Sequence, residues 1–192
     1  MVESQFPTLF YIQDLDFKPL HARYVEKMYA IKETTPSTNM WECDTYGSFQ
    51  TYDLRTEPLF KTFLDECTVH VDRFAKQFGV LKAKAQCDGS WFNISRPGNF
   101  QEFHMHAMSH FSAVYYVKTP EKCGNIVFKS HEADTNMFLL PIDESTPYNW
   151  STVFYPAIEG RLIIFRSNLQ HMVQKNMANE DRISIAMNFR MV

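Results

Sequence analysis

Two histidines that stand two residues apart offer the clearest chemistry in this sequence. His104 and His106 belong to the segment EFHMHAM, residues 102–108, which we predict to be a β-strand. Alternate residues of a strand point to the same side, so this strand would place the two imidazoles about 7 Å apart on one face. Neutral imidazoles are common metal ligands. The pair therefore predicts a metal site, provided that a third ligand lies nearby.

The third ligand must come from a distant part of the chain. His171 opens a predicted strand, residues 171–176, directly after the apolar segment GRLIIFRS, and we take it as the third ligand. Glu102 shares a strand face with the histidine pair, so it is an alternative carboxylate ligand that would move one histidine out of the coordination sphere. His110 follows the pair at a turn and is a candidate for contacting a ligand. The remaining histidines are expected to be structural: His21, His70 and His131.

A second pair of residues indicates anion binding. Arg182 and Ser184 share one face of a predicted strand over residues 182–190. A buried guanidinium beside a hydroxyl forms a fork that suits a carboxylate. Arg166 is either a cation that faces a substrate or a solvated strand residue, and the acidic loop 141–150 is either a lid over the site or a plain surface loop.

The elements that must position these residues fall into two groups. Apolar residues recur every three or four positions over 17–33 and 56–78, which predicts two helices. About eight short strand-like segments separated by Pro, Gly, Asn and Asp turns follow from residue 88. This order favours an antiparallel sandwich or jelly roll over a parallel α/β sheet. We expect one domain over 1–192, in which 1–86 give mainly helical support and 87–192 form the jelly-roll core with the metal site.

Composition narrows the classes of function. The chain has 192 residues, 45% hydrophobic residues and a formal net charge of −3, so it is globular and nucleic acid is not its default partner. Four cysteines without C-x-x-C spacing and the lack of a secretory leader favour a reducing, cytosol-like compartment. No apolar run approaches the roughly 18 residues that span a bilayer, so no membrane role is expected.

The order of these motifs resembles that of a known superfamily. H-x-H, a distal histidine and R-x-S resemble the 2-oxoglutarate and Fe(II)-dependent oxygenases, whose fold is a double-stranded β-helix, a form of jelly roll. The likeness is closest to the prolyl-hydroxylase-like oxygenases of phages and bacteria that carry an H-x-H motif, and it covers about residues 88–190. The matching segments in this chain are WFN at 91–93, HMH at 104–106, SAVYY at 112–116, CGNIVF at 123–128, EGRLIIFRSNLQH at 159–171 and DRISIAMNF at 181–189.

The resemblance implies a role for each matching residue. His104 and His171 would bind the metal, and His106 stands where most of the superfamily has an aspartate ligand. Three neutral imidazoles make the ferrous site one charge more positive than the usual triad, yet leave positions open for the cosubstrate and O2. The residues implied for 2-oxoglutarate are Arg182, Ser184 and Tyr116 at its distal carboxylate, and Asn93 as a further contact.

The resemblance thus implies an enzyme, a 2-oxoglutarate-dependent dioxygenase. It would couple oxidative decarboxylation of 2-oxoglutarate to hydroxylation of an organic or protein substrate, which the prolyl-hydroxylase likeness suggests is a peptidyl proline. One alternative is a three-histidine cupin-type dioxygenase that does not use 2-oxoglutarate, which would leave Arg182 and Ser184 without a purpose. Another is a non-enzymatic metal-binding β-sandwich module. A homodimer is a further expectation, as is the cytoplasm of a bacterial host if the protein is phage-encoded.

Overall fold

The structure, a computed structural model, describes residues 1–131 and 141–192. Two α-helices cover one side of the molecule, α1 (His21–Thr34) and α2 (Lys61–Ala75). Four short 3₁₀ helices flank or precede them: Lys18–Leu20, Leu54–Thr56, Pro58–Phe60 and Lys76–Phe78. The strands are β1 (Tyr11–Asp14), β2 (Tyr46–Gly47), β3 (Ala85–Ser95), β4 (Gln101–His104), β5 (Phe111–Lys118), β6 (Asn125–Lys129), β7 (Thr152–Pro156), β8 (Arg161–Arg166), β9 (His171–Val173) and β10 (Arg182–Met191).

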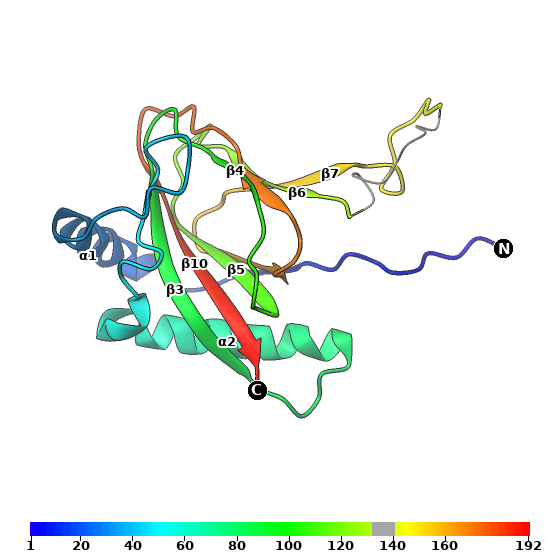
Figure 1. Ribbon diagram of the computed structural model, residues 1–192, viewed down its shortest axis with the longest axis horizontal. Helices are drawn as coiled ribbons and strands as arrows, with labels where there is room; N and C mark the ends of the chain where they lie inside the picture. Colours follow the sequence, from blue (N-terminus) through cyan, green and yellow to red (C-terminus); the bar gives the residue numbers. More distant parts are fainter. Residues whose placement is uncertain (132–140) are drawn as a thin grey trace.

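These strands form two antiparallel sheets that face each other. One sheet has six strands in the order β1-β8-β5-β10-β3-β2, and the other has four in the order β4-β9-β6-β7. Neighbouring strands are often far apart in sequence, which is typical of a jelly roll. The hairpin of β6 and β7 projects from the body of the molecule (Figure 1). The predicted mainly β, jelly-roll fold class is confirmed.

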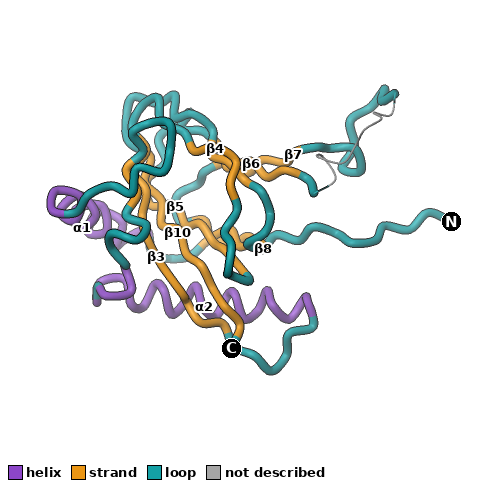
Figure 2. Tube along the Cα trace, in the orientation of Figure 1, coloured by secondary structure: helices purple, strands orange, loops and turns teal. Residues whose placement is uncertain are grey.

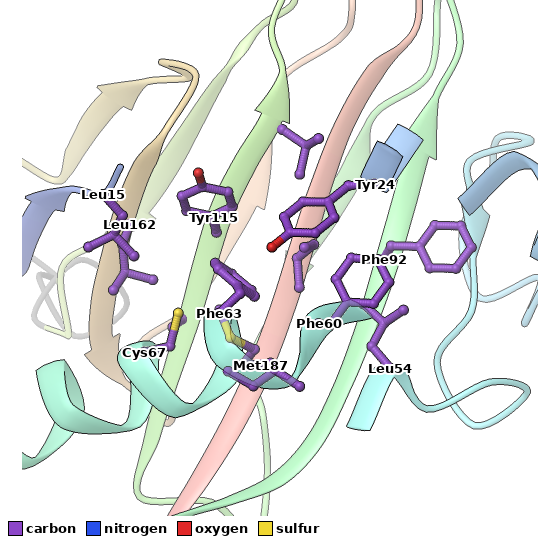
Figure 3. Close-up of a cluster of buried hydrophobic side chains, with 14 of the residues drawn as sticks. Leu15, Tyr24, Leu54, Phe60, Phe63, Cys67, Phe92, Tyr115, Leu162 and Met187 are labelled. Atoms are coloured by element: carbon purple, nitrogen blue, oxygen red, sulfur yellow. The ribbon is translucent and has the colours of Figure 1, made fainter. Parts of the chain in front are cut away.

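Both helices pack on the outer face of the six-stranded sheet, as Figure 2 shows with helices below and beside the strands. Alternation along β10 separates the two faces of the sheet. Ile183, Ile185, Met187 and Phe189 are buried against the helices, whereas the intervening residues line a pocket between the sheets. Aromatic rings dominate the helix-facing core, where Tyr24 contacts Phe60 and Phe63, and Phe63 contacts Tyr115 of β5 (Figure 3). This core fixes the sheet that carries the inner-face residues.

Three local features differ from the sequence-based expectation. Strand β4 ends at His104, so His106 is not on a strand as predicted, because its backbone N–H turns away to donate to the Ser167 carbonyl at 2.9 Å. The short strands β1 and β2 were not predicted, and both add to the six-stranded sheet from within residues 1–86. The predicted helix over 56–78 is α-helical only over Lys61–Ala75, with 3₁₀ turns at both ends.

The helix-facing core contains residues from both 1–86 and 87–192, and the single domain over 1–192 with its division stays a prediction. Within the described part of the chain, no helix is both long and apolar enough to cross a membrane.

Stability is expected to fall in acid because of His21. Its Nε2 lies 2.8 Å from the Tyr115 hydroxyl in the core, and burial lowers the pKa of this imidazole. His21 therefore binds a proton more readily in the unfolded chain than in the folded one. Its contribution to the free energy of unfolding is present above the unfolded pKa of about 6.5, and it is lost as the pH falls through the lower folded pKa. Urea unfolding of His21→Gln from pH 7 to pH 5 should show a stability slope smaller than that of the unmodified protein, by up to about 1.4 kcal/mol per pH unit. An unchanged slope would contradict this role.

Candidate active site

Three histidines from distant segments meet between the sheets. His104 ends β4, His106 follows two residues later, and His171 opens β9 directly opposite His104 in register. Their potential ligand atoms all lie within 4.8 Å of one another. In the described part of the chain, these three form the one group of this kind. The structure thus brings the predicted triad together, even though His106 reaches it from a loop.

Hydrogen bonds fix the orientation of all three rings. The Nδ1–H groups of His104 and His171 donate to the backbone carbonyls of Glu102 and Leu169, at 2.8 and 2.9 Å. His106 Nδ1 donates to the Asn188 side-chain oxygen at 2.8 Å. Because these partners are acceptors, each ring carries its proton on Nδ1 and presents the Nε2 lone pair.

The rings are neutral at ordinary pH. Burial lowers the pKa of His104, lowers that of His106 to about 4, and holds that of His171 well below its usual value. Three neutral imidazole nitrogens aimed at one point are a donor set that suits Fe(II). The residues present therefore fit a ferrous ion.

The other histidine and carboxylate candidates lie outside this cluster. One Glu102 carboxylate oxygen accepts from the Glu42 backbone N–H at 2.8 Å, and Glu102 is not a member of the histidine group. His110 is exposed, and its Nδ1 accepts from the Met191 backbone N–H at 3.0 Å. His21 and His70 lie on the two helices, and each contacts a tyrosine hydroxyl, as expected of structural residues.

A pocket of about 280 Å³ joins the histidines to the predicted anion-binding residues. Cross-strand pairing explains how, because Ser184 of β10 lies opposite Asn93 of β3 on one side and Tyr116 of β5 on the other. Arg182 is two residues away on the same face. All four line the pocket together with the three histidines.

Among the described residues, Arg182 is the one cation that lines this pocket, and it is 2% exposed. Its guanidinium donates to the Cys123 carbonyl at 2.9 Å and to the Ser95 hydroxyl at 2.8 Å. No carboxylate of the described residues pairs with it, and burial lowers its pKa. A buried guanidinium without a counter-ion is costly unless a ligand supplies one. This observation fits a small carboxylate such as 2-oxoglutarate.

Gly124 allows the backbone to pack closely around the Arg182 guanidinium. Its φ is +86°, and a Cβ atom at this position would lie 2.5 Å from the Gln174 carbonyl oxygen. Only glycine allows the chain before β6 to approach residues 174–175 so closely. The close approach brings the Cys123 and Gln174 carbonyls to the same guanidinium.

Two functional candidates were missed in the sequence. Asn188 holds His106 and also accepts a hydrogen bond from Ser112, 2.9 Å away. Asn188 lies an even number of positions after Arg182 and Ser184, so it lies on the same face of the strand. This spacing is the signal in the sequence that could have identified it. Trp41 packs edge-on against His104 with ring centroids 4.8 Å apart, but it lies in an irregular segment without periodicity.

Arg166 and the loop 141–150, whose roles the sequence left open, both lie outside the site. Arg166 is exposed on β8 and lies over the rings of Phe78 and Phe111, 5.4 Å from each centroid. The loop 141–150 contributes no residue to the pocket lining. Both observations favour the plain surface interpretation.

Comparison with known proteins agrees with this geometry. The family model described as "Putative 2OG-Fe(II) oxygenase" matches residues 89–188, just over half of the chain. No curated protein matches the sequence.

Solved structures share the fold at low identity. A Pseudomonas putida prolyl-4-hydroxylase is 16% identical with a TM-score of 0.63, over 95% of this chain and 92% of that one. HygX from Streptomyces hygroscopicus, solved with nickel and 2-oxoglutarate bound, is 12% identical with a TM-score of 0.67, over 95% and 83%. A 2OG-Fe(II) oxygenase family protein from Burkholderia pseudomallei is 16% identical with a TM-score of 0.56, over 88% and 78%.

The family match separates the oxygenase hypothesis from the cupin-type dioxygenase and the non-enzymatic module. The chain belongs to the 2OG-Fe(II) oxygenase family, and it is accordingly an oxidoreductase that uses Fe(II), 2-oxoglutarate and O2.

Proposed function

We propose that His104, His106 and His171 bind Fe(II), and that Arg182 anchors the distal carboxylate of 2-oxoglutarate. The observation that carries this proposal is the buried Arg182 guanidinium, which lines the histidine pocket without a carboxylate partner among the described residues. Ser184 and Tyr116 stand in one cross-strand pair beside it, so their hydroxyls are placed to donate to the same carboxylate. Asn93, on the other side of Ser184, is a further contact for the cosubstrate.

The chain's own residues bind the metal and the cosubstrate, orient them and exclude water from the cavity. The three histidines would hold the ferrous ion through their Nε2 atoms, which border the pocket. When bound, Fe(II) with 2-oxoglutarate and O2 supplies the oxidising power for hydroxylation of a C–H bond, with release of succinate and CO2. Arg182 fixes the far end of the cosubstrate, and the apolar rings of Trp41, Trp91 and Phe165 keep the cavity dry. No side chain is required as a general acid or base.

The test of this proposal is an anaerobic titration of the Fe(II)-loaded protein with 2-oxoglutarate. A visible charge-transfer band that saturates with one equivalent, together with heat of binding in calorimetry, would establish the chelate. Glutarate, the same acid without the keto group, should bind far more weakly. Bound iron without any band or heat on addition of 2-oxoglutarate would contradict the assignment of the site.

Asn188 is expected to support metal binding through His106. Asn188→Ala removes the acceptor that fixes the His106 ring, so Fe(II) affinity should fall about 10- to 100-fold. Asn188→Asp keeps an oxygen acceptor at the same place and should restore most of the affinity. Calorimetry with Fe(II), and with Co(II) as a spectroscopic probe, measures both variants. Equal affinities in Asn188→Ala and the unmodified protein would show that the contact is only structural.

For the substrate, we propose a peptidyl proline. The aromatic rings of Trp41, Phe49 and Trp91 line the pocket, and none of its described lining residues is acidic. Flat aromatic faces suit a neutral ring such as that of proline. The similarity of the fold to a prolyl-4-hydroxylase supports the same choice.

Two broader proposals concern assembly and location. The edge strand β7 exposes 63% of Phe154, which supports a homodimer formed through this edge. The four cysteines are unpaired thiols, which supports a reducing, cytosol-like compartment, that of a bacterial host if the protein is phage-encoded.

A further inference from the structure

A second depression adjoins the histidine pocket. It has a volume of about 460 Å³, and residues 49–53, 88–91 and 107–109 line it together with Asn188. We refer to it as the outer groove. The two cavities share Phe49, Trp91, Ala107 and Asn188, so they are neighbours.

The inner face of β10 extends from the histidine pocket to the outer groove. Arg182, Ser184, Ala186 and Asn188 follow one another on this face over about 20 Å. The proposed cosubstrate occupies the Arg182 end, and Asn188, at the opposite end, contacts His106 and lines the outer groove. A substrate that approaches the metal from the side away from the cosubstrate therefore meets this groove.

The charges of the outer groove favour a neutral occupant over an anionic one. Asp53 and Asp88 line it, whereas no lysine or arginine is part of its described lining. Each aspartate is bonded to an arginine, at 2.5 Å in Asp53–Arg55 and Asp88–Arg190. Because both carboxylates are already paired and the described lining holds no further cation, a neutral ligand is compatible with this surface, whereas a carboxylate or phosphate would find no cationic partner in it.

The remaining groups suit a carbonyl-rich chain. The Asn188 side-chain oxygen already accepts from His106 and Ser112, so its amide N–H groups are the part left for a ligand, and these donate. Phe49 and Trp91 form an apolar wall, with ring centroids 4.8 Å apart. A neutral peptide offers carbonyl acceptors and apolar side chains together.

Two residues that line the groove from different segments adopt strained backbone conformations. Gln50 and Met108 face it from different segments, and both are non-glycine residues in the left-handed region, with φ of 62° and 72°. Such conformations are costly and cluster at ligand-binding sites. Met108 is also 92% exposed, so its conformation does not serve the packing of the core.

We propose that the outer groove binds the neutral polypeptide segment next to the residue that enters the histidine pocket. This inference rests on the proposed function, and it assigns to the chain a second substrate-binding subsite. Asn188 then donates to a backbone carbonyl of the peptide while its oxygen holds His106.

Gly89 offers a way to block the groove alone. It lies opposite Asn188 on β3, its φ is outside the left-handed region, and a Cβ atom added there would meet no atom within 4 Å. Gly89→Trp should fill the groove without a clash in the fold, and Gly89→Leu is a smaller second variant. Gln86→Trp, an exposed position on the same strand outside the groove lining, is the matched control.

The probes are N-acetylproline amide, N-acetylhexaproline amide and maltohexaose, titrated calorimetrically into anaerobic protein loaded with Fe(II) and 2-oxoglutarate. We expect the hexapeptide to bind at least about tenfold more tightly than the single residue. Gly89→Trp and Gly89→Leu should remove that gain but leave 2-oxoglutarate affinity unchanged, and Gln86→Trp should change neither. Retained 2-oxoglutarate affinity also proves that each variant is folded.

Other outcomes overturn the inference in distinguishable ways. Equal affinity of the two peptides, or a gain that survives in Gly89→Trp, would show that the groove is not a subsite. Binding of maltohexaose that Gly89→Trp abolishes would assign the groove to a glycoside. Absence of binding by both peptides in protein that binds 2-oxoglutarate normally would overturn the peptide assignment, whereas failure of 2-oxoglutarate itself to bind would overturn the proposed function.

Discussion

Replacement of Arg182 by leucine is expected to weaken 2-oxoglutarate binding by roughly 30-fold to several thousand-fold. The reason is that removal of one partner from a buried charge pair costs about 2–5 kcal/mol. In the part of the chain that the structure describes, Arg182 is the one cation that lines the pocket, so no neighbour there replaces it. Calorimetric titration of Fe(II)-loaded protein with 2-oxoglutarate gives the measurement.

Fe(II) affinity should be unchanged in Arg182→Leu, since the histidines do not depend on the guanidinium. Arg182→Lys keeps the charge but loses the planar fork and should give an intermediate affinity. Arg166→Leu is the matched control, because Arg166 is exposed and outside the pocket. The assignment would be wrong if Arg182→Leu and Arg166→Leu bound 2-oxoglutarate equally well.

Replacement of His171 by alanine is expected to reduce Fe(II) affinity by more than about 100-fold, which exceeds the usual effect of removing a residue that only supports a ligand. His171 is 4% exposed and opposes His104 across the β4–β9 pair. Its loss leaves two nitrogen donors, too few to hold a ferrous ion against water. Metal content after dialysis and calorimetry with Fe(II) measure the effect, and circular dichroism verifies folding.

Three further variants separate the possible ligand sets. His110→Ala is the control for a nearby histidine outside the cluster and should bind iron normally. Glu102→Gln tests the carboxylate alternative and should also leave affinity unchanged. His106→Asp restores the usual carboxylate of the superfamily and should retain iron. Loss of iron in Glu102→Gln, with His106→Ala unaffected, would instead make Glu102 the third ligand.

Periodicity in the sequence was a reliable guide wherever one face of a strand is buried. All eight strands expected after residue 88 are present, and Arg182 and Ser184 share the predicted face. Alternation works there because Ile183 and Ile185 must face the helices. The same rule extended to Asn188 would have identified the partner of His106.

Periodicity fails where hydrogen bonds made by the rest of the fold determine the path of the chain. His106 leaves the strand because its N–H donates to Ser167, a contact with a segment 61 residues later in the chain. β2 has two residues, too few for any pattern, and Trp41 comes from an irregular segment that only tertiary contacts hold against His104. The three predicted histidines lie together in the structure, although His106 reaches the group from a loop and not from the predicted strand.

The place of β10 in the sheet has a consequence for biosynthesis. β10 pairs with β5 on one side and β3 on the other, although both partners precede it by more than 60 residues in the chain. At a synthesis rate of about 5–20 residues per second, the apolar edges of β3 and β5 lack their common partner for several seconds. Unpaired apolar edges recruit other chains. Slower growth at low temperature and chaperones that shield strand edges should therefore raise the yield of folded enzyme.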